Sequence, residues 1–187
     1  MGSTTDIRKG TVIKHQGELY VVSAFQFVNP GKGSAFTKTK MKGIKTGKTI
    51  EITYKSGESV ETVDVEHQNM QYLYKSGDFY SFMNKDSYET ADVSPDTLGE
   101  SAPFLKEGMD TVAIVYEGAV VAMELPKKAT YTVASAPPAE KGDTAGGNVT
   151  KEIELENGLK IQAPIFIKEG DQVIVNTETG IYDSRTS

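Results

Sequence analysis

The chain has 187 residues, of which 37% are hydrophobic and 18 are glycines, and it contains neither cysteine nor tryptophan. The lack of cysteine excludes disulfides, thiol catalysis and thiolate metal sites, and the modest apolar content predicts several small β-rich cores. The net charge of -6 is divided unevenly along the chain. Residues 1–60 carry ten basic and four acidic side chains, which gives a charge of +6 there and leaves -12 for residues 61–187. This division indicates that the N-terminal end meets a polyanion such as RNA.

The first sixty residues alternate polar and apolar side chains between glycine turns. Strands are expected over residues 11–15, 18–28, 35–42 and 48–54, a set of the size of an SH3-like barrel. So small a unit buries only about 60% of the surface of its unfolded chain, and we expect it to pack against the next one. Lys38, Lys40 and Lys42 alternate within one strand and should line one face, where they are able to follow the phosphates of RNA. A row of solvated lysines without a partner is the alternative.

The turn between the second and third of these strands carries one lysine at its tip, in the order Pro30, Gly31, Lys32, Gly33 and Ser34. Pro30 fixes its own φ, and the two glycines allow backbone conformations that other residues avoid. With no bulky side chain at its apex, this hairpin is suited to enter a narrow space with Lys32 foremost. An ordinary turn with a solvated lysine is the alternative interpretation.

Two further sets of five strands are expected after residue 62. The second set comprises residues 63–66, 69–74, 78–84, 111–116 and 119–125, and the third comprises residues 129–133, 149–155, 159–162, 172–176 and 180–184. Ser94 followed by Pro95 predicts one short helix within the second set, ending near Gly108. Five short strands to a set suit small Greek-key barrels.

No enzyme motif is present in the sequence. Lys32 and Lys48 lie beside glycines but lack the spacing of a nucleotide-binding loop. His15 and His67 lie far from any acidic cluster of metal-ligand spacing, so no metal site is predicted. The chain also lacks a long apolar run and the apolar centre of a signal peptide, so a cytoplasmic protein that avoids membranes is expected.

Five aromatic residues gather at the start of the second set. They either fill the barrel or form a platform for stacked bases: Tyr72, Tyr74, Phe79, Tyr80 and Phe82. We expect most of them in the core, because this acidic stretch has few lysines to hold a phosphate backbone.

Four segments resemble the bacterial translation elongation factor P family, in the family's order. They are PGKGSAF at residues 30–36, YLYKSGDFYSFM at 72–83, GDTA at 142–145 and GIYDSR at 180–185. The resemblance implies an all-β chain of three small barrels in a row, one SH3-like (KOW-like) domain and two OB-folds, with an L-shaped outline similar to that of transfer RNA. The domains expected on this basis are residues 1–63, 64–127 and 128–187.

The resemblance also implies a function. A member of this family binds the 70S ribosome between the peptidyl (P) and exit (E) sites and promotes peptide-bond formation at stalled runs of proline by positioning peptidyl-tRNA. P-site tRNA and ribosomal RNA are therefore the expected partners of the chain, which would act as a monomer and not as an enzyme.

Particular residues take roles by the same resemblance. Lys32 would point to the peptidyl-transferase centre, and the basic domain would face the acceptor stem. The small-subunit contacts implied are Gly142, Asp143, Thr144, Tyr182 and Arg185. No cofactor is expected, but the family often extends the tip lysine covalently, for example by β-lysylation, which would add a modifying enzyme to the partners. Asn29 and Ser34 differ from the best-known β-lysylated branch, so the modification stays open.

A stand-alone SH3/OB module that binds single-stranded RNA is the competing interpretation. It predicts salt-sensitive binding to free RNA. The translation-factor interpretation predicts weak binding to free RNA and strong binding to ribosomes with an empty exit site.

Overall fold

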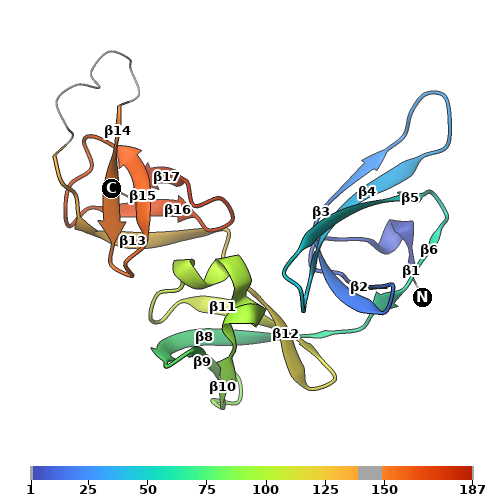
Figure 1. Cartoon of the computed structure of the whole chain (residues 1–187), viewed down its shortest axis with the longest axis horizontal. Helices are drawn as coiled ribbons and strands as arrows, with labels where there is room; N and C mark the ends of the chain where they lie inside the picture. The colour runs from blue at the N-terminus through green and yellow to red at the C-terminus, as the bar shows by residue number, and fades with distance from the viewer. Residues whose placement is uncertain (1, 139–148, 187) are drawn as a thin grey trace.

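The computed structural model describes residues 2–138 and 149–186, and strands account for most of this part of the chain (Figure 1). Three five-stranded antiparallel sheets follow one another along the sequence, with a two-stranded ladder beside the first. The N-terminal and C-terminal units lie at the two ends of the molecule and the middle unit lies between them, which gives the molecule a bent outline (Figure 1). The predicted all-β architecture of three small units is confirmed.

The first unit forms around a sheet of order β5-β4-β3-β2-β7. Its elements are β1 (Gly2–Ser3), the 3-10 helix η1 (Thr4–Asp6), β2 (Val12–His15), β3 (Glu18–Val28), β4 (Phe36–Gly43), β5 (Thr49–Lys55), β6 (Ser59–Val60) and β7 (Thr62–Val63). The alternating apolar side chains of these strands form a separate small core of Ile7, Ile13, Val22, Met41, Tyr54 and Val60. This unit therefore has an interior of its own.

The second and third units share one topology. The second contains β8 (Glu66–Ser76), β9 (Phe79–Asn84), β10 (Thr90–Val93), α1 (Pro95–Leu98), the 3-10 helix η2 (Gly99–Phe104), β11 (Asp110–Tyr116) and β12 (Ala119–Glu124). The third contains β13 (Lys128–Ser135), β14 (Thr150–Leu155), β15 (Lys160–Pro164), β16 (Gln172–Asn176) and β17 (Tyr182–Arg185). In both sheets the first strand lies at the centre, flanked by the second and the fourth.

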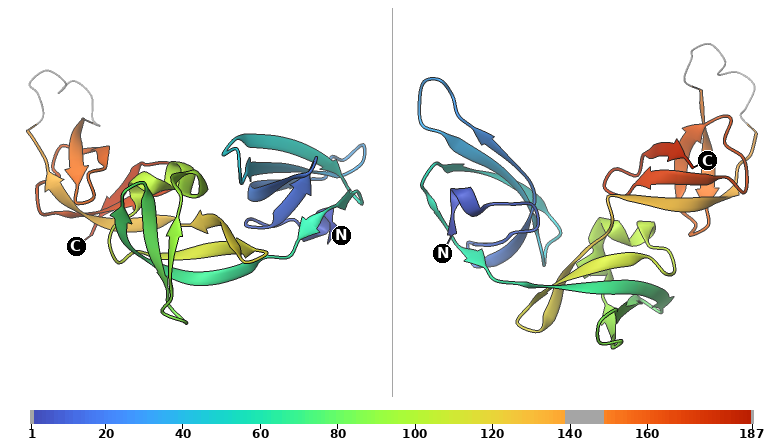
Figure 2. Two further views of the ribbon diagram at one scale, coloured as in Figure 1. Left: turned by 60° about the horizontal axis from the view of Figure 1, so that its bottom comes forward. Right: turned by 180° about the vertical axis from the view of Figure 1, so that it is seen from behind.

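One hydrophobic cluster runs through both of these units. It extends from Met70 and Phe82 in the second unit to Tyr131, Ile153 and Val175 in the third. Both views in Figure 2 place the two units against each other, and the Tyr131 hydroxyl of the third unit donates to the carbonyl oxygen of Phe104 at the end of η2. The C-terminal two-thirds of the chain is therefore one packed body, while the first unit is attached to it.

Two sequence predictions for the second unit need correction, and one of its strands was missed. The strands expected at residues 63–66 and 69–74 do not exist as such, because β8 runs unbroken from Glu66 to Ser76 and pairs first with β11 and then with β9. Strand β10 had not been predicted; four residues are too few to show a clear alternation. The helix begins as expected, with the Ser94 hydroxyl accepting from the Thr97 amide, but it ends before Gly108.

The early end of that helix has a local cause. Gly99 takes a left-handed φ of 54° and closes α1 after four residues. The 3-10 turn that follows ends at Phe104, just after Pro103, which has no amide hydrogen to donate. In the part of the chain that the structure describes, no helix has the length and apolarity needed to span a bilayer.

Candidate nucleic-acid interface

The predicted tip loop joins β3 to β4 and projects beyond the paired strands of the first sheet (Figure 1). Their ladder runs from Tyr20 opposite Gly43 to Val28 opposite Phe36, with a bulge between Val22 and Ala24. A bulge adds one residue to one strand and increases its twist. The bulge therefore increases the twist of β3. Because β5 accompanies β4 as far as the pair of Phe36 and Lys55, only the tip loop extends beyond the paired strands.

Lys32 occupies the apex of this loop and is exposed, as are Gly31, Gly33 and Ser34 around it. Gly33 has a φ of 110°, which only glycine adopts readily, and a Cβ on Gly31 would meet no atom within 4 Å. Within the described residues, no acidic side chain forms an ion pair with Lys32. The amine is thus presented to the surroundings on a narrow support, as the sequence predicted, while its role stays a prediction.

Lys38, Lys40 and Lys42 form the expected row on one face of β4. The residues between them, Thr39 and Met41, are both 0% exposed on the opposite face, so the alternation is complete. Glu51, opposite Lys40 on β5, is the one charged cross-strand neighbour of the row. The other neighbours are neutral, namely Gln26, Ala24 and Val21 on β3 and Thr53 and Thr49 on β5. The row is therefore a nearly uncompensated strip of positive charge.

Lys42, the last member of the row, differs from the others in its surroundings. It is only half-exposed, and its Nζ lies 2.8 Å from the position that a Cβ on Gly99 would occupy. A side chain at position 99 would require the end of Lys42 to move, and the positive φ of Gly99 also favours glycine there. The structure thus brings Lys38 and Lys40 together as an open surface and places Lys42 at the junction with the next unit.

Tyr182 and Arg185 lie on β17, the last strand of the third unit. Simple alternation would place residues three apart on opposite faces of a strand. The register, however, pairs Val173 with Arg185 and Val175 with Tyr182, leaving Asp183 as the extra residue of a bulge. Because Val173 and Val175 share a face, the bulge returns Tyr182 and Arg185 to the same face. The sequence could not indicate this.

The surroundings of Arg185 hold its guanidinium in place. Its Cζ lies 5.7 Å from the centre of the Phe166 ring, and one of its nitrogens lies 3.7 Å from a carboxylate oxygen of Asp171. Tyr182 packs against the core, and burial is the main cause that raises its pKa, while the charge of Arg185 acts in the opposite direction. Gly142, Asp143 and Thr144, the other predicted small-subunit contacts, lie outside the described residues.

The aromatic residues of the second unit separate into two groups. Tyr72 and Phe82 are buried, and Tyr80 packs against the same cluster, as expected for a core. Tyr74 and Phe79 are 59% and 50% exposed. Core placement is thus confirmed for most of the group.

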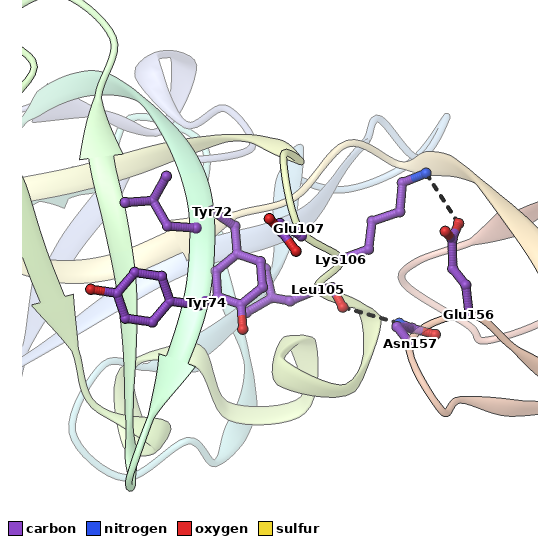
Figure 3. Close-up of a pocket in the computed structure, with 8 residues that line it drawn as sticks. Tyr72, Tyr74, Leu105, Lys106, Glu107, Glu156 and Asn157 are labelled. Carbon is purple, nitrogen blue, oxygen red and sulfur yellow. Dashed lines mark hydrogen bonds and ion pairs between the residues drawn. The ribbon is translucent and has the colours of Figure 1, made fainter.

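Tyr72 and Tyr74 line a hollow of about 390 Å³ where the second and third units meet (Figure 3). Beside the hollow, Asn157 Nδ2 donates to the carbonyl oxygen of Leu105 at 3.1 Å, and Lys106 Nζ lies 3.4 Å from Glu156 Oε1 (Figure 3). These polar groups are occupied in holding the two units together. We therefore interpret the hollow as part of the joint.

Sequence reasoning did not single out several exposed apolar residues. On the hairpin, Phe25 and Phe27 are 41% and 59% exposed, and the guanidinium of Arg8 lies 5.8 Å from the centre of the Phe25 ring. In the third unit Phe166 is exposed next to Arg185. The spacing of Phe25 and Phe27, two residues apart in an expected strand, was visible in the sequence, but it predicts burial equally well.

Comparison with known proteins bears on the whole chain. Three family models match it in succession: the elongation factor P KOW-like domain over residues 3–60, the elongation factor P OB domain over residues 65–123, and the elongation factor P C-terminal domain over residues 129–185. The chain belongs to the elongation factor P family. The resemblance inferred from four short segments is thereby confirmed.

One relative matches almost end to end. The chain is 40% identical over 185 residues to elongation factor P of Synechocystis sp.. The matched region covers 99% of this chain and 98% of the relative. Among solved structures, initiation factor 5A of Methanococcus jannaschii matches at 20% identity over 67% of this chain and 90% of its own, with a TM-score of 0.45. A second protein of that family, from Naegleria fowleri, gives a TM-score of 0.39 at 20% identity over 66% of this chain and 96% of its own. The family assignment rests on the family models and on the Synechocystis relative, and it identifies the chain as a translation factor.

Proposed function

We propose that this elongation factor P family member binds the ribosome between the peptidyl and exit sites and promotes peptide-bond formation where synthesis stalls on consecutive prolines. The observation that carries the proposal is the long hairpin with Lys32 exposed at a slender tip, next to the strip formed by Lys38 and Lys40. A charged probe on a narrow support suits a confined, RNA-lined space.

The chain acts by positioning and supplies no catalytic group. Proline is a rigid and poor reactant, so a peptidyl ester that ends in proline can rest in an unproductive geometry. Holding the end of the tRNA in a reactive geometry removes an entropic part of the barrier, and such alignment is worth several kcal/mol in well-oriented systems, up to roughly 10. The ribosome then performs the chemistry with its own groups.

Each end of the molecule takes a separate part of this task. The lysine row contacts the phosphates of the P-site tRNA or ribosomal RNA. Arg185 presents a planar, permanently charged fork toward RNA of the small subunit, and Phe166 and Asp171 restrict its movement. By the family resemblance, Gly142, Asp143 and Thr144 contact the same subunit.

Lys32 carries a covalent extension in this proposal, such as a β-lysyl group in amide linkage to Nζ. An unmodified lysine reaches only about 6 Å from its backbone, at roughly 1.5 Å per bond. Gly31 and Gly33 leave the amine accessible to a modifying enzyme, since no neighbouring side chain crowds the position of their missing Cβ atoms closer than 3.9 Å.

The test is peptide synthesis on reconstituted ribosomes with a message that encodes three successive prolines, and a proline-free message as the control. Protein purified from its native host is expected to relieve the stall, and Lys32→Ala to abolish the relief. Lys45→Ala is the matched control, because Lys45 is an exposed lysine in the turn after β4. Lys32→Arg keeps the charge but cannot be acylated, and thus separates charge from modification.

Two outcomes contradict the proposal. The first is that the natively modified protein fails to relieve the proline stall. The second is that it binds free single-stranded RNA as tightly as ribosomes, with a steep dependence on salt. That result would favour the stand-alone RNA-binding module.

A further inference from the structure

We propose that Phe25, Phe27 and Arg8 form a binding site for the unpaired bases of RNA, on the face of the β3–β4 hairpin opposite to the lysine row. Phe25 pairs with Thr39 across the ladder and Phe27 pairs with Thr37, so both rings lie on the threonine face. Lys38 and Lys40 point the other way. The hairpin therefore has an aromatic face and a cationic face.

The aromatic face is left uncovered because the neighbouring strand is short. Strand β2 pairs with β3 only from Glu18 to Val21. Beyond Val22, no strand in the described part of the chain continues this edge of β3, and residues 23–27 are exposed. The rings of Phe25 and Phe27 thus lie at an open edge, in line along the strand.

Arg8 supplies a fixed positive charge beside the rings. Its Nη1 donates to the carbonyl oxygens of Thr5 at 2.8 Å and Ile7 at 2.7 Å, and its Cζ lies over Phe25. An arginine held in this way is able to pair with a phosphate while its neighbouring ring receives the attached base. This combination of stacking rings and a cation is the common means of binding single-stranded nucleic acid.

RNA is favoured over a peptide strand as the occupant. The first sixty residues carry a charge of +6, and the face opposite already has a strip of lysines suited to phosphates. If both faces bind RNA, the hairpin inserts between two RNA segments. The lysine face binds the phosphates of one segment, and the aromatic face binds the bases of the other. This inference rests on the proposed function, since a hairpin wedged between RNA segments is expected of a ribosome-bound factor.

The experiment uses the natural absence of tryptophan. Phe27→Trp in the full chain places one indole on the aromatic face, and Tyr88→Trp places one on an exposed residue of the second unit, 73% accessible, as the control. Each variant is titrated at low salt with an eight-residue oligoadenylate and with an abasic oligomer of equal length and charge. Stacked bases quench indole fluorescence, whereas phosphates alone do not.

We expect quenching at position 27 and none at position 88. The affinity for oligoadenylate should exceed that for the abasic oligomer by roughly fivefold or more, the effect of one stacked base. Adding Phe25→Leu should reduce this preference, while Phe25→Tyr, which keeps the ring, should restore it. Both positions are exposed, so the fold should tolerate these changes.

Equal quenching at the two positions, or equal affinity for the two oligomers, would overturn the proposal. So would binding of a peptide along residues 23–28 without any response to oligoadenylate, which would assign the edge to a protein partner. Co-sedimentation of the unaltered chain with ribosomes tests the proposed function separately. Ribosome binding without quenching would overturn only the stacking site.

Discussion

The two joints of this molecule are built in different ways. Between the second and third units, the hydrophobic cluster is continuous and Tyr131 is completely buried in it, with its hydroxyl donating to the carbonyl oxygen of Phe104. Asn157 Nδ2 adds hydrogen bonds to the carbonyl oxygens of Pro103 at 3.0 Å and Leu105 at 3.1 Å. Breaking this joint would expose apolar surface and leave several polar groups unpaired.

The first unit is held by contacts of another kind. Lys9 forms an exposed ion pair with Glu178 in the turn between β16 and β17, and Lys42 rests against Gly99. Its own core is separate from the cluster of the other two units. Exposed ion pairs contribute little to stability and are screened by salt. The comparison indicates a rigid two-unit body that carries a first unit whose angle is adjustable.

The largest expected effect is on the rigid joint. Tyr131→Ala should lower the free energy of unfolding of the second and third units by about 4 kcal/mol, the usual cost of removing a large aromatic side chain from a core. Calorimetry should show this loss in the transition of the two-unit body while the transition of the first unit keeps its temperature. Tyr74→Ala, at a residue 59% exposed, is the control and should cost far less. Equal losses in both transitions would contradict the distinction between the joints.

A smaller effect is expected from high pH. Burial raises the pKa of Tyr131 to about 12, from an ordinary value of 10.0. Because the folded pKa is the higher one, the associated stabilisation is complete below pH 10 and is lost as the pH rises through 12. At about 1.4 kcal/mol per pKa unit, the loss is roughly 2–3 kcal/mol. Chemical unfolding of Tyr131→Phe at pH 9 and pH 12 provides the comparison, since this variant should lose less stability over that interval.

The smallest effect concerns the polar joint. Glu178→Gln should change the free energy of unfolding by less than about 1 kcal/mol, yet it should widen the distribution of angles between the first unit and the rest. Because the chain has no cysteine, dyes can be attached at Lys45→Cys and Glu169→Cys and their distance followed by energy transfer. Raising the salt concentration should widen the distribution of distances in the same way when the Lys9–Glu178 ion pair is left unaltered.

Glu152→Gln is the matched control for this last experiment. Glu152 also forms an exposed ion pair, with Lys160 at 3.8 Å, but both residues belong to the third unit. The Glu152→Gln substitution should therefore leave the distance between the dyes unchanged. If it altered that distance as much as Glu178→Gln does, the Lys9–Glu178 pair would not be what restrains the first unit.

The sequence by itself determined much of this protein. Alternation and turn residues predicted most strands to within one or two residues, and they placed Lys38, Lys40 and Lys42 on one face of β4 with Lys32 at an exposed tip. These properties depend on local periodicity and on the conformational limits of proline and glycine, which act within a few residues of each other.

Tertiary structure decided the rest. Only the register of β17 against β16 shows the bulge that returns Tyr182 and Arg185 to one face, and only the shortness of β2 leaves Phe25 and Phe27 uncovered. Likewise, the fusion of two cores around Tyr131 and the pairing of Lys9 with Glu178 join residues far apart in the chain. Contacts of this kind depend on how whole units pack, and no local pattern in the sequence records them.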